Sequence, residues 1–152
     1  MTIFPLPEPM KRALALADEA AAADEVPVGA VITDSRGAVV AEAGNAMRGG
    51  SDPTAHAEML AIRRAGEALG TSRLDGCTLW VSLEPCAMCA GAIALARIEK
   101  LVFAAEDPKG GGVAHGARVF SHPTCHHRPE VLSGVGEQEA ARQLREFFAA
   151  RR

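Results

Sequence analysis

Two short motifs constrain this chain more than any other feature: His56-Ala57-Glu58 and Pro85-Cys86-Ala87-Met88-Cys89. Together they offer one imidazole, two thiols and one carboxylate, with 29 residues between His56 and Cys86. Imidazole and thiolate are the ligands that zinc prefers in proteins. A fold that uses both motifs for one metal must bring two distant segments to the same place.

The three expected ligands, His56, Cys86 and Cys89, suit a catalytic zinc better than a structural one. A structural zinc closes its shell with four protein ligands, whereas a catalytic zinc keeps one position for water. Zinc lowers the pKa of bound water from 15.7 to about 7. Glu58 lies two residues from His56, so we expect it to reach this water without binding the metal and to act as a general acid and base.

Other interpretations of the cysteines and histidines remain open. A single C-x-x-C could be a redox pair or half of a structural zinc site. No second C-x-x-C is present, and Cys77 and Cys125 are isolated. Three histidines and Cys125 lie in residues 122–127, but their spacing does not support a second metal site.

Composition indicates a globular protein. The chain has 152 residues, of which 48% are apolar, so we expect a single domain over residues 1–152. The net charge of −3 gives no overall signature of nucleic-acid binding, which leaves room for a local basic patch. The N-terminal segment lacks the apolar run of a signal peptide, and the longest apolar run, residues 86–96, is too short to span a bilayer. We therefore expect a soluble, cytoplasmic protein.

Hydrophobic periodicity and turn residues predict the order α-ββ-α-β-α-β-β-α. Helices are expected at residues 9–23, 56–69, 86–96 and 137–152, and strands at 26–33, 38–43, 78–83, 100–105 and 130–133. The first two strands show little alternation, so both are expected to be largely buried. This order predicts an α/β fold, a three-layer α/β/α sandwich with a mixed five-stranded sheet. The two motifs then lie at the starts of two helices, where the helix dipole favours thiolates.

The motifs resemble those of the cytidine-deaminase-like superfamily, and most closely the bacterial tRNA-specific adenosine deaminases. The similarity covers nearly the whole chain and is carried by residues 26–31, 52–58 and 83–92. The zinc motifs are shared with cytosine and guanine deaminases. The stretches that favour tRNA are less specific: residues 97–98, 107–110, 122–123 and 147–148. His126 and the glycine run at residues 110–112 depart from the family's pattern.

This resemblance implies a hydrolase that converts adenosine to inosine at the wobble position of a tRNA anticodon loop. It implies one zinc per chain on His56, Cys86 and Cys89, with Glu58 moving protons. Substrate contacts are implied for Asn45, the backbone N–H of Ala57, the carbonyl of Leu83, and Asp107, Lys109 and Phe148. It further implies a homodimer that binds tRNA, with neither DNA nor a membrane as partner.

Alternatives to these residue roles and to this activity remain open. Asn45 could be a turn residue at the end of a strand, and Phe148 could simply pack the last helix. The alternative activity is deamination of a free base or nucleotide, such as guanine or cytosine. The alternative of another class is a catalytically silent, zinc-dependent RNA-binding subunit. Glu58 argues against the latter, because a structural site has no use for a carboxylate beside its open position.

Overall fold

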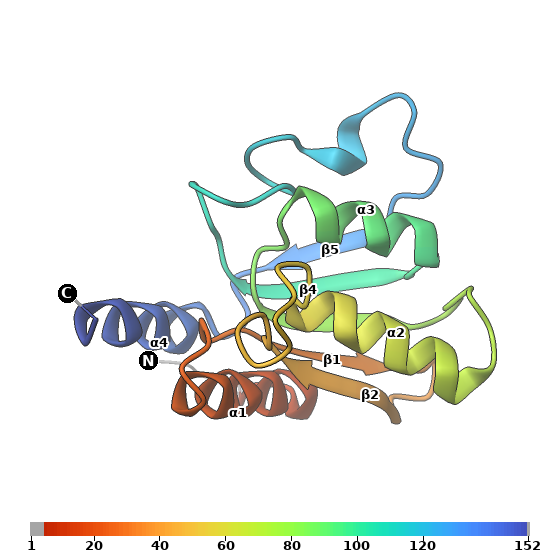
Figure 1. The fold of residues 1–152 in the computed structure, drawn as a ribbon. Helices are drawn as coiled ribbons and strands as arrows, with labels where there is room; N and C mark the ends of the chain where they lie inside the picture. The colour runs from red at the N-terminus through yellow and green to blue at the C-terminus, as the bar shows by residue number, and fades with distance from the viewer. Residues whose placement is uncertain (1–4, 152) are drawn as a thin grey trace.

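A computed structural model describes residues 5–151 as three layers, with a central sheet between two pairs of helices (Figure 1). The helices are α1 (Glu8–Ala22), α2 (Ala57–Leu69), α3 (Ala87–Ala96) and α4 (Glu137–Ala149). The strands are β1 (Gly29–Thr33), β2 (Val39–Gly44), β3 (Thr78–Leu83), β4 (Lys100–Ala105) and β5 (Glu130–Ser133), and a short 3₁₀ helix, η1, spans Val119–Ser121. The predicted order of elements is therefore confirmed.

The sheet is mixed, as predicted, with the strand order β2-β1-β3-β4-β5. β1 pairs antiparallel with both β2 and β3, whereas β3, β4 and β5 run parallel. The parallel half requires a helical crossover between β3 and β4, and α3 supplies it. Because α3 begins just beyond the carboxyl end of β3, this edge of the sheet receives the second motif.

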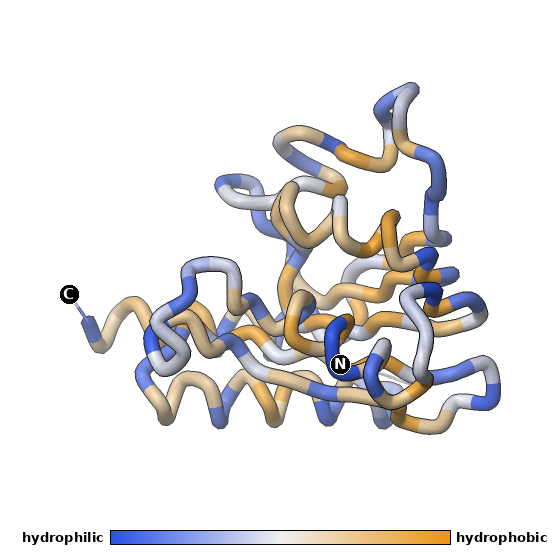
Figure 2. The backbone as a smooth tube through the Cα atoms, turned by 45° about the vertical axis from the view of Figure 1, so that its right-hand side comes forward, coloured by the Kyte–Doolittle hydropathy of each residue, from blue (hydrophilic) through white to orange (hydrophobic). Residues whose placement is uncertain are grey.

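Apolar side chains pack on both faces of the sheet, and the strands form the hydrophobic centre of the molecule (Figure 2). One buried cluster joins the sheet to α2 and α3 through residues such as Ala61, Ile93 and Phe103. The other joins the opposite face to α1 and α4 through residues such as Met10 and Ala140. No helix within residues 5–151 is long and apolar enough to cross a membrane.

Two expectations about the first hairpin are corrected. β1 begins at Gly29 rather than Val26, because the Val28 N–H donates to the Val26 carbonyl at 2.9 Å in a tight turn and Pro27 has no N–H to pair. β1 is buried throughout, whereas β2 begins at the exposed Val39 and then alternates between half-buried and buried residues. β2 is an edge strand in which only Ala41 and Ala43 are buried, so the prediction that it is largely buried was wrong.

The helix boundaries near the motifs also differ from those predicted. His56 and Cys86 are the N-cap residues of α2 and α3, with extended backbones, and do not lie in the first helical turns. Their carbonyls already accept the first helical hydrogen bonds, from Leu60 at 3.0 Å and Ala90 at 2.9 Å. At the other end of the chain, α4 ends at Ala149 rather than residue 152, and residue 152 lies outside the described part.

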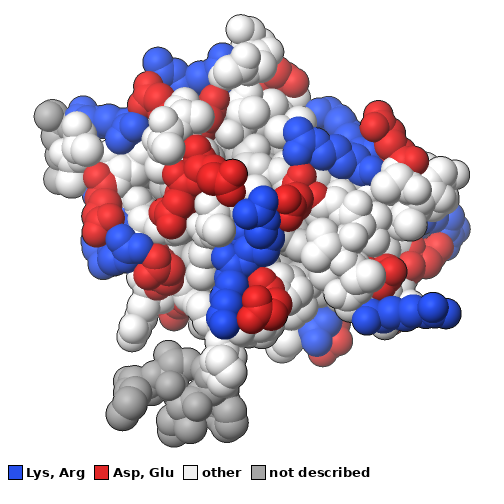
Figure 3. Space-filling view, turned by 90° about the horizontal axis from the view of Figure 1, so that it is seen from below, with Lys and Arg blue, Asp and Glu red and all other residues white. Residues whose placement is uncertain are grey.

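The face seen from the side of α1 carries both signs of charge, interspersed (Figure 3). Ion pairs on α1 join Lys11 to Glu8 at 3.1 Å, and Arg12 to Glu19 and Glu42 at 3.3 and 2.7 Å. This face therefore lacks the single-sign field that would attract a polyanion. A site for a charged partner must be sought elsewhere.

Candidate active site

The fold brings His56, Cys86 and Cys89 together. His56 Nδ1 lies 3.6 Å from Cys86 Sγ and 3.5 Å from Cys89 Sγ, and all three ligand atoms lie within 4.8 Å of one another. Zinc bonds of ~2.3 Å to sulfur and ~2.0 Å to nitrogen, in tetrahedral geometry, place nitrogen and sulfur about 3.5 Å apart. The three side chains therefore fit one tetrahedral metal ion and leave its fourth position open.

The starts of α2 and α3 position these ligands. The extended backbones at His56 (φ −71°, ψ 151°) and Cys86 (φ −72°, ψ 175°) precede the helices, and Cys89 follows in the first turn of α3. Both helices direct their positive ends at the cluster, which favours thiolates. The predicted convergence of two helix N-termini is confirmed, and two of the three candidate ligands, His56 and Cys86, are the N-cap residues.

Protons are shared unequally within the cluster. Hydrogen bonds from Cys89 and His56 lower the pKa of the Cys86 thiol to about 3. The pKa of Cys89 is raised because its thiol donates to Cys86 and is buried. The pKa of His56 is raised because its ring donates to Cys86. A metal that binds all three groups must displace these protons, so its affinity depends on pH.

Glu58 borders the cluster without belonging to it. It lies in the first turn of α2, is only 4% exposed, and lines a cavity together with His56 and Cys86. Burial raises the pKa of its carboxyl from 4.5 to about 7. A carboxyl whose pKa lies near neutrality can both accept and return a proton, which is what general acid–base catalysis requires.

The cavity beside the cluster has a volume of about 240 Å³. Its further walls come from the α1–β1 loop, the β2–α2 loop, the end of β3 and the loop after β4; the residues include Val28, Asn45, Met47, Leu83, Asp107 and Gly110. Asn45, Leu83 and Asp107, which the resemblance implicated, thus lie where a substrate would meet Glu58.

Asn45 orders the start of α2. Its Oδ1 accepts the Ala57 N–H at 2.8 Å, and its Nδ2 donates to the Val26 carbonyl at 3.1 Å. Asn45 is 8% exposed, and these two hydrogen bonds hold its amide between Val26 and the start of α2. The Ala57 N–H, implicated in contacting the base, is bonded to Asn45 in this structure.

Two other implicated residues lie outside this cavity. Lys109 is exposed in the loop after β4, and its backbone N–H donates to Asp107 Oδ1 at 3.2 Å. Phe148 is 48% exposed and borders a separate depression on α4. Phe147, at 7% exposed, is the residue that packs into the protein. Core packing is therefore not the role of Phe148.

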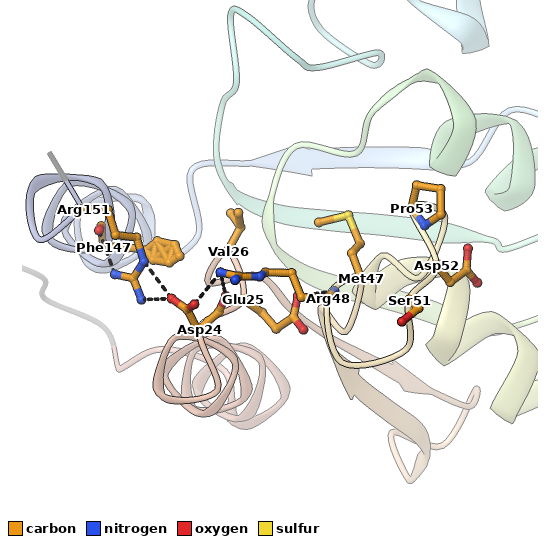
Figure 4. A pocket seen from close by; sticks show the side chains of 10 residues that line it. All are labelled: Asp24, Glu25, Val26, Met47, Arg48, Ser51, Asp52, Pro53, Phe147 and Arg151. Atoms are coloured by element: carbon orange, nitrogen blue, oxygen red, sulfur yellow. Dashed lines mark hydrogen bonds and ion pairs between the residues drawn. The ribbon is translucent and has the colours of Figure 1, made fainter.

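A second cavity, of about 520 Å³, adjoins the first and shares Val26 and Met47 with it (Figure 4). At its rim Asp24 forms ion pairs with both Arg48 and Arg151, the latter at 2.7 Å. Hydrogen bonding by Arg151 lowers the pKa of Asp24. The Arg151 guanidinium also lies 3.4 Å above the centre of the Phe147 ring. This arrangement draws together residues that are far apart in the sequence and was not predicted from it.

Two buried carboxylates that hold the cavity walls were also missed. Glu25 accepts the backbone N–H groups of Arg48 at 3.0 Å and Gly49 at 2.8 Å. Glu84, at 2% exposed, accepts hydrogen bonds from the loop after β4. Burial acts to raise the pKa of Glu84, but bonds from the Asp107 backbone and the His115 ring outweigh it and hold this pKa below its usual value. The available sequence signal was a glutamate directly before Pro85 and Cys86.

The histidines of residues 122–127 do not gather around a metal. His122 Nε2 lies 2.7 Å from the Ala117 carbonyl, and His127 Nε2 lies 2.6 Å from the Ile98 carbonyl. Within the described part of the chain, His56, Cys86 and Cys89 form the one group of such side chains close enough to share an ion. All four cysteines are free thiols.

Comparison with known proteins agrees with this geometry. The family model of the cytidine and deoxycytidylate deaminase zinc-binding region matches residues 7–105. A tRNA-specific adenosine deaminase of Agrobacterium fabrum is 54% identical over 94% of this chain and 93% of its own length.

Solved structures of related deaminases share this fold. A structure from a study of A-to-I editing by tRNA:A34 deaminases at the wobble position superposes with a TM-score of 0.88 at 54% identity, covering 90% of this chain and 98% of the other. A guanine deaminase of Nitrosomonas europaea gives a TM-score of 0.80 at 29% identity, covering 97% and 87% of the two chains.

Proposed function

Since the chain belongs to the tRNA-specific adenosine deaminases, within the family of the cytidine and deoxycytidylate deaminase zinc-binding region, we propose that it deaminates adenosine to inosine at the wobble position of a tRNA anticodon loop. The observation that carries this proposal is the buried carboxylate of Glu58 beside an open three-ligand metal site. A purely structural site would have no use for this carboxylate. We therefore set aside the reading as a silent RNA-binding subunit.

His56, Cys86 and Cys89 would hold one zinc ion per chain. Zinc bound there supplies acidification of water at its open position. The two thiolates would balance the charge of Zn²⁺ and so weaken this acidification, which makes a neighbouring base valuable. Cys86 and Cys89 sit at the positive end of α3, which keeps both sulfurs anionic once the metal is present.

Glu58 would carry the protons of the reaction. With its pKa raised to about 7 by burial, its carboxylate accepts a proton from the attacking water and delivers it to N1 of the adenine. The same group then takes the proton of the new hydroxyl at C6 and passes it to the amino group, which leaves as ammonia while the C6 carbonyl forms. Because Glu58 is on rigid α2 and shielded from solvent, each proton returns to the substrate rather than to bulk water.

The surroundings of the site suit an RNA loop better than a free base. The adjoining cavity, of about 520 Å³, gives space for a nucleotide beside the reacting one. Asp107, Lys109 and Phe148 are assigned to neighbouring nucleotides, with the exposed Lys109 meeting phosphate and the exposed ring of Phe148 stacking on a base. Asn45 would orient the purine.

We also propose that the protein acts as a homodimer through the outer face of α3. This helix carries no charged residue, yet Leu95 is 82% and Met88 37% exposed. A helix that is apolar all round is normally covered. A second copy would cover this face, and Leu95→Glu would shift the sedimentation coefficient to that of a monomer. A wild-type protein that sediments as a monomer at micromolar concentration would refute this.

Residues 1–152 would form a single deaminase domain, since one sheet unites all the described elements. The free thiols suit a reducing compartment, and tRNA is met in the cytoplasm, which we propose as the location. Neither a membrane nor DNA has a part in this proposal.

The decisive experiment measures inosine formed in an anticodon stem-loop with adenosine at the wobble position. Free adenosine, guanine and cytosine are assayed in parallel for ammonia release. We expect turnover of the stem-loop alone, and loss of that turnover by ~10²–10⁴-fold in Glu58→Gln with zinc content unchanged. Equal rates on stem-loop and free adenosine, or activity of Glu58→Gln within tenfold of wild type, would overturn the proposal.

Deamination of free guanine is the second candidate, favoured by the similarity to the guanine deaminase. It uses the same zinc chemistry at a purine ring. Ammonia release from guanine with none from the stem-loop would establish this candidate instead.

A further inference from the structure

Glu84 is a buried carboxylate that no step of the proposed chemistry uses. Its side chain has no exposed surface, and it directly follows β3. Taking a carboxylate out of water costs several kcal/mol unless its oxygens are fully hydrogen bonded. A group of this kind beside an active site calls for a physical reason.

All five partners of Glu84 lie in one loop, residues 107–115. Oε1 accepts the Asp107 N–H at 3.0 Å and the His115 Nδ1–H at 2.8 Å. Oε2 accepts the N–H groups of Val113, Ala114 and His115 at 3.2, 3.0 and 3.1 Å. Glu84 therefore accepts hydrogen bonds from both ends of this loop and ties them together.

The loop is built to fit around this carboxylate. A Cβ added to Gly111 would lie 2.2 Å from Glu84 Oε2, and one added to Gly112 would lie 2.5 Å from the Ala87 nitrogen. The Gly112 N–H also donates to the Pro85 carbonyl at 2.8 Å. The glycine run thus lets the loop approach both Glu84 and the start of α3, and it does so by contacts that would exclude a side chain.

This loop forms one wall of the cavity beside Glu58. Asp107 and Gly110 line that cavity, and Asp107 Oδ1 accepts the Gly110 N–H at 2.9 Å. The loop touches the start of α3 through Gly112, but the side chains of Cys86 and Cys89 hydrogen-bond to their neighbour His56 and not to the loop. A change in the loop would therefore alter how the substrate is held more than how protons are moved.

We propose that Glu84 is a positioning residue: it fixes the loop of residues 107–115 as the wall of the substrate cavity and thereby sets substrate affinity. The proposal rests on the proposed function for its kinetic part alone. Its structural part, the ordering of the loop, holds whatever the substrate is.

Glu84→Gln tests this with little change of shape. In this variant an NH₂ group replaces one of the two carboxylate oxygens. Each oxygen accepts from at least two donors of the loop, so at least two donors lose their acceptor. We expect KM for the anticodon stem-loop to rise by about tenfold, the factor given by about 1.4 kcal/mol of lost contact, while kcat changes by less than about threefold. Amide hydrogen exchange at residues 113–115 should accelerate by about tenfold or more.

Gly111→Ala perturbs the same contact from the loop side and leaves Glu84 intact. It should raise KM and loop exchange in the same direction, which keeps the proposal testable if Glu84→Gln folds poorly. Glu42→Gln is the matched control: it breaks the ion pair with Arg12 at 2.7 Å on β2, so it can lower stability but should change neither KM nor loop exchange.

The outcomes separate cleanly. A rise in KM with accelerated loop exchange and zinc content equal to wild type supports the proposal. Unchanged loop exchange in both variants, or activity loss fully accounted for by loss of zinc or of folded protein, overturns it. If the wild type deaminates no RNA, the proposed function fails, whereas the exchange measurement still decides whether Glu84 orders the loop.

Discussion

Burial of Glu58 makes the stability of the metal-free protein depend on pH in a definite direction. The folded protein raises the pKa of this carboxyl from 4.5 to about 7, and the unfolded chain restores its ordinary value. Between the two values the folded state binds a proton that the unfolded state has lost. The contribution is therefore fully present below pH 4.5 and is lost as the pH rises through 7.

The magnitude follows from the gap of about 2.5 pH units at 1.36 kcal/mol per unit, which gives about 3 kcal/mol in all. Within this window the free energy of unfolding should fall by about 1.4 kcal/mol per pH unit. Domains are stable by only ~5–15 kcal/mol, so the effect is large enough to measure. Glu58→Gln, neutral and of the same shape, should lack it.

The assay is urea unfolding in the presence of a chelator, at pH 5, 6, 7 and 8, for wild type and Glu58→Gln. Subtracting the two free energies of unfolding cancels the titration of His56 and the thiols to first order. Glu67→Gln, at an exposed position of α2, should keep the wild-type behaviour because it leaves Glu58 in place. Parallel curves for wild type and Glu58→Gln, or a wild type whose free energy of unfolding rises relative to that of Glu58→Gln between pH 5 and 7, would refute the reasoning.

Three further outcomes are expected. Cys86→Ala and Cys89→Ala should each lose zinc, measured by atomic absorption, and lower the melting temperature together with it; full zinc content in both would contradict the ligand assignment. Lys109→Ala should weaken stem-loop binding and reduce the slope of log Kd against log salt by about 1, and an unchanged slope would contradict a phosphate contact. Phe148→Ala should cost ~1–3 kcal/mol of RNA affinity at an unchanged melting temperature. A fall in melting temperature for Phe148→Ala would argue against stacking. By contrast, Phe147→Ala removes a buried ring and should lower the free energy of unfolding by ~3–5 kcal/mol.

The sequence predicted which side chains would form the candidate metal site. His56, Cys86 and Cys89 are the right ligand types at the starts of two predicted helices, and the structure brings them within tetrahedral distances. Ligand types and their spacing can be recognised in the sequence, because zinc binds particular side chains such as thiolates and imidazoles. The order of strands and helices was equally readable, since periodicity records which residues face the core.

The sequence could not show what Glu84 and Glu25 do. Their partners are backbone N–H groups in loops 23 to 31 residues away, and every residue except proline has such a group. Apart from the position of Glu84 directly before Pro85 and Cys86, no side-chain pattern therefore marks them. The ion pairs of Asp24 with Arg48 and Arg151 could not be predicted for a related reason, because they join the α1–β1 loop, the β2–α2 loop and the segment after α4, which meet only in the folded protein.

What the sequence determined by itself was which atoms can bind metal and which segments form the sheet, because both depend on side-chain type and local periodicity. The tertiary structure alone decided that β2 is only partly buried, that His56 and Cys86 cap their helices, and that Phe148 faces outward while Phe147 is buried. It also decided the pKa of Glu58. A pKa shift of this kind arises from exclusion of water by packed neighbours, and that exclusion exists only once the chain has folded.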